Sequence, residues 1–379
     1  MLEGEKRNMM RFTSYLAIIS YNINCNFTNY GSALQSWALN RSIGKFGYEP
    51  VLVDYCPKVL ENADALNPIK QMWDKDSEIV RLTEMSMPAI RENFYKFEDF
   101  YTKRFRRTAK KYYDNDFNEI VEDEKVERFV CGSDTIFCID EFKGFAEGYY
   151  ANFDCMKGRS ISYAASFGDS HFSDDDYKTL KQRLQNFKAL GLRENDMVDY
   201  VKSQVNVPVQ RTIDPTLLLK QEDYDTIAAE RLVAEKYLLL YSRRHNAQMY
   251  AYAEKIAKER NLKIVDISLK AIGEKDHIPY YQAGVEEFLS LVKYVECVVT
   301  NSFHGIIFSV QYRRQFYGFT RQECNTKINE LMELFGLSGC LLVTGDEKTM
   351  EINYEKVHSN IDKARTKSLE FLKQSLELL

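Results

Sequence analysis

The sequence predicts an α/β protein of two domains, each built on a parallel sheet that helices cover. Two strand–helix–strand patterns carry this prediction, one beginning near residue 14 and the other near residue 237. In both patterns the short apolar strands end in small or polar residues, and open parallel sheets bind ligands at that edge. We therefore expect two Rossmann-like domains that face each other across a cleft.

The N-terminal pattern opens with the apolar run 14–20, which is typical of a buried strand. Apolar residues at helical spacing then occupy 32–45, Gly47 ends this helix, and a second strand follows at 50–55. A helix between two strands makes those strands parallel neighbours. Further strand-like runs stand at 129–131, 161–165 and 190–192. We assign residues 10–215 to this domain.

Residues 57–127 form an insert of different character, with many charges and little strand pattern. Aromatic and basic residues are mixed between Phe94 and Arg107. One interpretation is a surface for an anionic glycan, lipid or nucleic acid, which would allow peripheral contact with a membrane. The other, which we favour, is an amphipathic helix whose Phe and Tyr side chains pack on the sheet.

The chain is expected to cross between the domains at 207–219, where Pro215 forces Asp214 into an extended conformation. A polar helix is expected at 222–231. The second domain, 216–350, then alternates strands and helices. Its strands are expected at 237–241, 263–267, 294–299 and 316–319, and its helices at 246–260, 286–294, 306–311 and 326–336. A long helix within 351–379 closes the chain.

Composition and charge exclude several classes of protein. The chain has 379 residues and a net charge of −5, and its pI near 5.8 argues against a nucleic-acid binder. No apolar run reaches the ~18–20 residues needed to span a bilayer, so we expect a cytoplasmic protein. The eight cysteines include no C-x-x-C pair, which predicts reduced thiols and no metal site. They are Cys25, Cys56, Cys131, Cys138, Cys155, Cys297, Cys324 and Cys340.

His304 lies in the turn where a strand passes into a helix. Ser302 is placed to cap that helix, and Gly305 follows the histidine. An imidazole in this position can move protons near neutral pH, and the amides of Gly305 and Ile306 can hold an anion. The alternative is a histidine that only packs the turn, and the sequence leaves both interpretations open.

Arg193 follows another predicted strand, so its guanidinium would point into the edge where ligands collect. A structural pair with an acidic side chain is the equal alternative. Arg243 stands at a third strand end and either grips an anion or carries solvated charge. The turn at Gly31 and Ser32 lacks G-x-G-x-x-G, and a plain strand-to-helix turn explains it better than a phosphate loop.

Short motifs in a fixed order make the chain resemble the polysaccharide pyruvyl transferase family. They cover roughly residues 14–340 and are specific in combination rather than singly. The motifs are Asn29-Tyr30-Gly31-Ser32 with Leu34-Gln35, Gly132-Ser133-Asp134, Ser162 to Gly168, Leu192-Arg193-Glu194, Asp214 to Leu218, Ser302-Phe303-His304-Gly305, and Asn325 with Lys327-Ile328 and Leu331.

This resemblance implies a fold similar to that of GT-B glycosyltransferases. It also implies transfer of the enolpyruvyl skeleton of phosphoenolpyruvate to two hydroxyls of a sugar, giving a pyruvate ketal. The acceptor would be a nucleotide- or lipid-linked precursor of a surface or capsular polysaccharide. Phosphoenolpyruvate is the co-substrate, and no other cofactor, metal or nucleic acid is expected. The protein would work in the cytoplasm or at the inner face of the membrane.

The resemblance also suggests roles for single residues. Arg193 would bind the donor anion and His304 would be the general acid and base. Donor-binding residues would be Arg193, Ser302, His304, Gly305 and Arg243. Acceptor-binding residues, on the side of the N-terminal domain, would be Asn29, Tyr30, Gly31, Ser32, Ser133 and Asp134.

The chain departs from the family pattern in three places. Thr135 and Phe137 stand where the family usually has Gln and Trp, and Asn301 stands where Asp is common. Gly191-Leu192 replaces a commoner Ser-Val. These departures put the acceptor in question and keep two alternatives open. One is a GT-B glycosyltransferase that uses a nucleotide sugar, and the other is a non-catalytic protein of glycan assembly.

Overall fold

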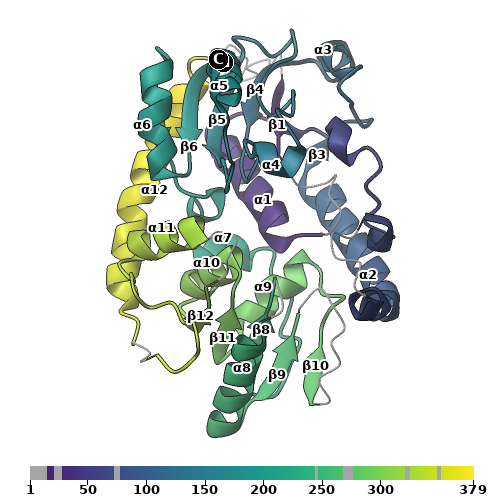
Figure 1. The fold of residues 1–379 in the computed structure, drawn as a ribbon, viewed down its shortest axis with the longest axis vertical. Helices are drawn as coiled ribbons and strands as arrows, with labels where there is room; N and C mark the ends of the chain where they lie inside the picture. The colour runs from purple at the N-terminus through teal and green to yellow at the C-terminus, as the bar shows by residue number, and fades with distance from the viewer. Residues whose placement is uncertain are drawn as a thin grey trace, which may run out of the picture.

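The computed structural model describes residues 15–20, 28–71, 77–243, 246–267, 276–320, 325–347 and 351–379. Its described strands form two sheets, of seven and five strands, which lie one above the other in Figure 1. Every pairing within these two sheets is parallel. The predicted α/β class with two Rossmann-like sheets is confirmed.

The first sheet has the order β3 (Arg106–Arg107), β2 (Pro50–Leu52), β1 (Tyr15–Ile19), β4 (Val126–Cys131), β5 (Ser160–Ala165), β6 (Phe187–Leu192) and β7 (Val209–Arg211). The second sheet has the order β10 (His277–Pro279), β9 (Lys263–Asp266), β8 (Tyr237–Tyr241), β11 (Cys297–Thr300) and β12 (Gln315–Gly318).

The described α-helices are α1 (Tyr30–Lys45), α2 (Ser77–Arg104), α3 (Ile120–Glu124), α4 (Ile139–Phe142), α5 (Asp174–Leu184), α6 (Asn195–Gln204), α7 (Gln221–Asp225), α8 (Ala247–Arg260), α9 (Val285–Lys293), α10 (Phe303–Gln311), α11 (Asn325–Phe335) and α12 (Tyr354–Leu376). Short 3-10 turns lie at Lys58–Leu60, Pro68–Gln71, Phe117–Glu119 and Pro215–Leu217.

The central strand β1 is buried on both faces. Leu16 and Ile18 face a core that continues through α1 into the second sheet, where it includes Leu239. Ala17 and Ile19 face a separate core on the other side of the first sheet. Burial on both faces explains why β1 reads as a continuous apolar run rather than an alternating one.

The C-terminal helix α12 ties the two sheets together. It runs along one side of the molecule, from beside the seven-stranded sheet to the level of α10 and α11 (yellow in Figure 1). Phe371 of α12 is so close to Gly191 of β6 that a Cβ there would lie 2.9 Å from its ring. Arg365 donates from Nε to the carbonyl oxygen of Leu217, at 2.7 Å, and from Nη2 to that of Leu219. The helix therefore also fixes the segment that connects the sheets.

The insert contains the amphipathic helix that we favoured. Phe97, Phe100 and Tyr101 of α2 are buried in the core that joins the sheets. Bases of the insert are paired with acids, as in the contacts Lys96–Glu287 and Arg104–Glu286 from α2 and Arg107–Glu98 from β3. Membrane contact by this face stays a prediction.

The sequence prediction was wrong in three places. Residues 207–211 belong to the expected crossing, but 209–211 form β7 beside β6. The helix expected at 222–231 is only α7, 221–225. The strands β3 and β10 were not predicted, because edge strands of two or three residues carry little apolar pattern; β3 is Arg-Arg.

Six of the cysteines lie in the described part of the chain and all six are free thiols. Cys25 and Cys324 lie outside the described residues, as does the predicted domain start at residue 10. No cluster of three or more metal-ligating side chains occurs among the described residues. No helix in the described ranges has both the length and the apolar character to cross a membrane.

Candidate active site

Residues from both sheets meet where the carboxyl ends of β4, β6 and β11 approach each other. Arg193 directly follows β6 and His304 is the second residue of α10, which follows β11. Asp134 comes from the loop after β4, and Asp214 from the segment that connects the sheets. All four side chains are largely buried, so their interactions are only weakly screened by water.

His304 is held by the turn that the sequence predicted. Ser302 is the N-cap of α10, and its Oγ accepts a hydrogen bond from the Gly305 amide at 3.2 Å. His304 is only 7% exposed, and its Nε2 lies 3.6 Å from Oδ2 of Asp214. That distance is too long for a hydrogen bond, and Nε2 has no other hydrogen-bond partner in the described part of the chain.

The turn amides differ from our expectation. The Gly305 amide is used by the Ser302 side chain, and the Ile306 amide donates to the Ser302 carbonyl oxygen at 3.0 Å. Both amides therefore already donate to Ser302, one to its side chain and one to its carbonyl oxygen. The expected anion site on Gly305 and Ile306 is therefore not formed by free amides.

Helix α1 comes into direct contact with the imidazole through Gly31. A Cβ added at Gly31 would lie 1.9 Å from Nδ1 of His304, which no side chain can occupy. Asn29 caps α1 by accepting from the Gly31 amide at 3.0 Å. Glycine at this position therefore lets the N-termini of α1 and α10 approach each other closely. It does not form a phosphate loop.

Arg193 is held mainly by acidic and hydroxyl oxygens. Its Nη2 lies 3.0 Å from Oδ2 of Asp214 and donates to Oγ of Ser133 at 2.7 Å. Its Nη1 lies 3.9 Å from Oδ1 of Asp134, and the guanidinium carbon lies 5.4 Å from the ring centre of Phe303. Arg193 therefore forms an ion pair with an acidic side chain, Asp214, as the alternative interpretation expected. This pair lies next to His304.

The two carboxylates are kept ionised by this surrounding charge. Burial alone would raise the pKa of Asp214, but Arg193 and His304 together hold it well below its usual range. Burial also opposes ionisation of Asp134, whose pKa is nevertheless lowered by Arg193, Lys327 and His304. The site is therefore a cluster of fixed charges around an imidazole.

The residues predicted for the acceptor divide into two groups. Ser32 donates from Oγ to Oδ2 of Asp134 at 3.0 Å, so Ser32, Ser133 and Asp134 lie in the cluster. Tyr30 points away from it: its ring stacks on Phe288 and its hydroxyl donates to the Ala283 carbonyl oxygen. Asn29 is occupied as the helix cap. These last two side chains hold the fold together.

Arg243 lies at the end of β8, beside the turn that carries His304. Its amide donates to Oδ1 of Asn301 at 2.9 Å. Its Nη1 is buried and has no hydrogen-bond partner among the residues that the structure describes. A cation is thus present beside the turn that carries His304.

The positions that depart from the family pattern have structural partners. The Thr135 hydroxyl donates to Oε2 of Glu141 at 2.6 Å. Phe137 is fully buried and stacks on Tyr150 with ring centres 4.5 Å apart. Asn301 supports Arg243. None of these contacts disturbs the positions of Arg193 or His304.

Two further residues of this region were not given a role by sequence reasoning. Asp214 was visible only as the residue before Pro215 and as part of a motif, and its contacts with Arg193 and His304 are long-range. Lys327 was noted only as part of a motif. Neither residue stands at the end of a predicted strand, so local pattern could not single them out. Their place within family motifs was the signal that the sequence offered.

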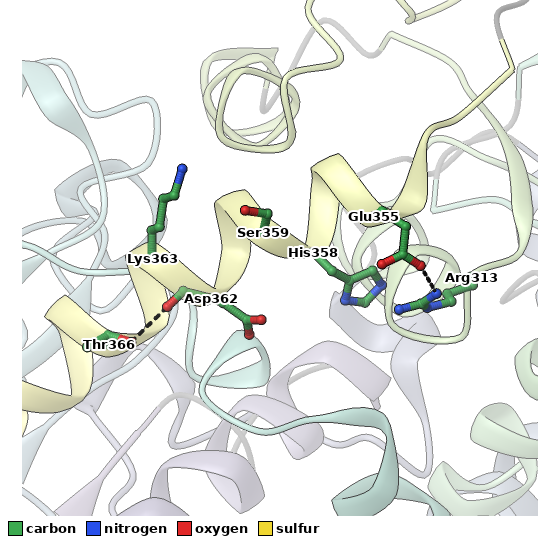
Figure 2. A pocket seen from close by; sticks show the side chains of 7 residues that line it. All are labelled: Arg313, Glu355, His358, Ser359, Asp362, Lys363 and Thr366. Atoms are coloured by element: carbon green, nitrogen blue, oxygen red, sulfur yellow. Dashed lines mark hydrogen bonds and ion pairs between the residues drawn. The ribbon is translucent and has the colours of Figure 1, made fainter.

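A surface groove lies elsewhere, at the far end of α10 (Figure 2). Seven side chains line it: Arg313, Glu355, His358, Ser359, Asp362, Lys363 and Thr366. Arg313 and Glu355 pair with each other across it, at 2.6 Å. It shares no lining residue with the Arg193–His304 cluster.

Comparison with known proteins finds solved structures with a similar fold and a family whose model matches the chain. Among solved structures, the chain is similar to S. aureus MnaA with UDP (13% identity, TM-score 0.46, covering 96% of this chain and 91% of that chain). It is also similar to a putative UDP-N-acetylglucosamine 2-epimerase from Listeria monocytogenes (10% identity, TM-score 0.49, covering 96% and 91%). A UDP-glucosyltransferase from Polygonum tinctorium is a third (10% identity, TM-score 0.40, covering 96% and 98%). At these sequence identities and TM-scores, the similarity carries no information about the donor or the acceptor of this chain.

No curated protein matches the chain. The family model for polysaccharide pyruvyl transferase matches residues 29–323. This span contains Arg193, Asp214 and His304 and more than half of the chain. The protein therefore belongs to the polysaccharide pyruvyl transferase family.

Proposed function

We propose that the protein is a transferase that forms a pyruvate ketal on a sugar, with phosphoenolpyruvate as donor. The observation that carries this proposal is the buried contact of Arg193 and His304 with one oxygen of Asp214. It brings a permanent cation and a proton carrier together in a member of a transferase family. The sugar would belong to a nucleotide- or lipid-linked precursor of a surface or capsular polysaccharide.

In this proposal Arg193 binds the carboxylate of the donor. Its Nη2 lies 3.0 Å from Asp214 and donates to Ser133 at 2.7 Å, and its Nη1 lies 3.9 Å from Asp134. The Nη1 edge can therefore turn toward an incoming anion without breaking the pair with Asp214. The Phe303 ring limits movement of the guanidinium on one side.

His304 is proposed to move the protons, through Nε2. Asp214 would stabilise the imidazolium, which protonates the methylene carbon of the donor. One sugar hydroxyl then bonds to C2, and the second replaces the phosphate when the C2–O bond breaks. Of the two hydroxyl protons, one returns to His304 and one leaves on the phosphate. No water is consumed, and the proposal uses no cofactor or metal.

The acceptor is proposed to approach from the side of α1. Ser32 and Asp134 are hydrogen-bonded to each other there, and Asp134 is kept ionised. An ionised carboxylate accepts hydrogen bonds from sugar hydroxyls and can orient the pair that attacks C2.

The test is product formation by the wild type and by His304→Ala. Incubation with phosphoenolpyruvate and a panel of nucleotide- and lipid-linked sugars should release phosphate and give an equal amount of ketal, read by mass spectrometry. The variant should stay folded and lose at least about a hundredfold in kcat, as for removal of a general acid–base group. Glycosyl transfer from a UDP-sugar without any ketal would replace this proposal by the glycosyltransferase alternative.

A further inference from the structure

Gln35 is a fully buried glutamine that the proposed chemistry does not use. It lies in the second turn of α1 and is 0% exposed. Glutamine is seldom buried so completely, because its amide gives up water and then needs hydrogen bonds at both the oxygen and the nitrogen. The sequence singled it out only as part of a motif, so a role for this side chain has to come from its contacts.

Both polar atoms of the Gln35 side chain have partners. Oε1 accepts from the backbone amide of Ser133 at 3.1 Å. Nε2 donates to the carbonyl oxygen of Ser32 at 3.0 Å and to the hydroxyls of Ser20 and Ser36, at 2.7 Å and 2.9 Å. A backbone amide can only donate and a carbonyl can only accept, so these partners fix which way the side-chain amide points.

Ser133 connects this contact to Arg193. Its hydroxyl donates to the carbonyl oxygen of Ala164 at 3.0 Å and accepts from Nη2 of Arg193 at 2.7 Å. Gln35 therefore holds Ser133 at its backbone, while Arg193 binds the same residue at its side chain. The position of the hydroxyl that receives Arg193 depends on the backbone that Gln35 holds.

The face of α1 that carries Gln35 also holds the next residue of the loop, Asp134. Ser32 lies three residues before Gln35 and so on the same face of the helix. Its hydroxyl donates to Oδ2 of Asp134 at 3.0 Å, and Oδ1 of Asp134 lies 3.9 Å from Nη1 of Arg193. Helix α1 thus fixes two consecutive residues that face Arg193, one through Gln35 and one through Ser32.

Loss of the Gln35 amide would change the direction of Arg193 rather than its charge. The Ser133 amide would lack this acceptor in a buried place, and the loop would have to shift to satisfy it. The hydroxyl that receives Nη2 would shift with the loop. The contact between Nη2 and Asp214, at 3.0 Å, does not involve Gln35. The guanidinium would therefore stay attached to Asp214 and could turn about that contact.

We propose that Gln35 is a positioning residue, which holds Ser133 and through it sets the direction in which Arg193 presents its guanidinium. The inference rests on the proposed function for the identity of the donor, but the positioning of Arg193 does not depend on it. A glutamine with a purely structural role would stabilise the fold and leave the direction of Arg193 to Asp214 alone.

The experiment compares three variants with two readouts. The variants are Gln35→Met, which keeps the length of the side chain without its hydrogen bonds, Ser133→Ala, and the two combined. The first readout is the rate at which phenylglyoxal modifies Arg193, followed by peptide mass spectrometry. The second is the Kd of phosphoenolpyruvate, from calorimetric titration.

The matched control is Ser160→Ala, at the start of β5 and so at the opposite end of that strand from the cluster. Ser160 is as completely buried as Gln35, and its hydroxyl donates to the carbonyl oxygen of Met156 at 2.7 Å. This variant loses a buried hydrogen bond and some stability. It should match the wild type in both readouts.

We expect Gln35→Met to raise the modification rate of Arg193 several-fold and to weaken binding of phosphoenolpyruvate about tenfold, as for loss of a hydrogen bond to a charged group. Ser133→Ala should have effects of the same size. Because both act through one contact, the double variant should stay near tenfold, whereas independent effects would multiply to about a hundredfold. The KM for the sugar should stay unchanged in Gln35→Met.

A folded Gln35→Met with the wild-type modification rate at Arg193 would overturn the inference and leave the proposed function standing. Effects of the two substitutions that multiply would also overturn it, because Gln35 would then not act through Ser133. Faster modification of Arg193 in Gln35→Met, beside a wild type that binds no phosphoenolpyruvate, would overturn the proposed function and keep the positioning role.

Ser133→Ala decides the matter alone if Gln35→Met does not fold. The proposed route passes through the Ser133 hydroxyl, so this variant should also raise the modification rate of Arg193 several-fold. A wild-type rate at Arg193 in folded Ser133→Ala would contradict the inference.

Discussion

Asp214 is the residue through which the two halves of the site are connected. One of its oxygens, Oδ2, lies near both Arg193 and His304, at 3.0 Å and 3.6 Å. The other, Oδ1, accepts from the amide and hydroxyl of Thr216 at 2.9 Å and 2.6 Å. A carboxylate fixed in this way sets the position of both side chains, and it stands on the segment that joins the sheets.

The lowered pKa of Asp214 predicts a pH dependence of stability. Its folded pKa lies below the unfolded value of about 3.9, so its contribution is complete above that pH and is lost as pH falls toward the folded pKa. Below about pH 4, the free energy of unfolding should fall more steeply in the wild type than in Asp214→Asn, by up to about 1.4 kcal/mol per pH unit. Urea unfolding across this range measures both slopes, and equal slopes would refute the assignment.

Substitution of Gly31 tests whether turnover depends on the position of the imidazole, without removing any charged side chain. Gly31→Ala places a Cβ 1.9 Å from Nδ1 of His304, so the ring or the start of α1 has to move. A displacement near 1 Å at reacting groups lowers kcat by about a hundredfold, so we expect a loss of about that size.

The matched control for this change is Gly44→Ala in the same helix, since a Cβ there meets nothing within 4 Å. It should keep wild-type kcat and gain up to about 1 kcal/mol of stability. Steady-state kinetics measures kcat of both variants, and urea unfolding measures their stability. Equal activity in the two would show that the contact between α1 and His304 has no part in turnover.

At the scale of elements, the sequence predicted the strands that are buried on both faces. β1, β8 and β11 are uninterrupted apolar runs, and each was placed to within one to three residues. The cap of α10 followed from Ser302 and is observed. The strands β3, β7 and β10 have only two or three residues each, which is too short for a recognisable apolar pattern.

The candidate site was predictable only in part for a related reason. A residue at a strand end, such as Arg193 or His304, is visible from local pattern alone. The contact of both with Asp214 depends on how two sheets meet, and it spans 21 and 90 positions of the sequence. Tyr30 shows the opposite error, since it stands within a family motif but packs on Phe288.

Helix α12 is predicted to hold the connecting segment through Arg365. Arg365→Met removes the donor to the Leu217 carbonyl oxygen and leaves that buried group without this partner. We expect a loss of about 1–3 kcal/mol in the free energy of unfolding. The control is Lys363→Met, an exposed position of the same helix, with a change within about 0.5 kcal/mol.

Hydrogen exchange should locate the effect of Arg365→Met. Faster exchange is expected in α12 and in the turn at 215–217, because the lost contact joins these two elements. A loss of stability equal in both variants would mean that Arg365 has no special part in holding the segment.

At the scale of the molecule, the site exists only where the two sheets are together. Arg193 and Asp134 come from the seven-stranded sheet, His304 and Lys327 follow strands of the five-stranded one, and Asp214 lies between. A continuous hydrophobic core, crossed by Tyr30 and α12, holds the sheets in this arrangement. Donor and acceptor are then proposed to meet at this junction.

The most direct test of this account is calorimetric titration of phosphoenolpyruvate into the wild type, His304→Ala and Arg193→Lys, each with and without sugar acceptor. We expect binding to the wild type, and at least about tenfold weaker binding to Arg193→Lys because an ammonium cannot replace the fork of a guanidinium. His304→Ala should bind the donor and form no ketal. No binding of phosphoenolpyruvate to the wild type, with a UDP-sugar bound instead, would contradict the account.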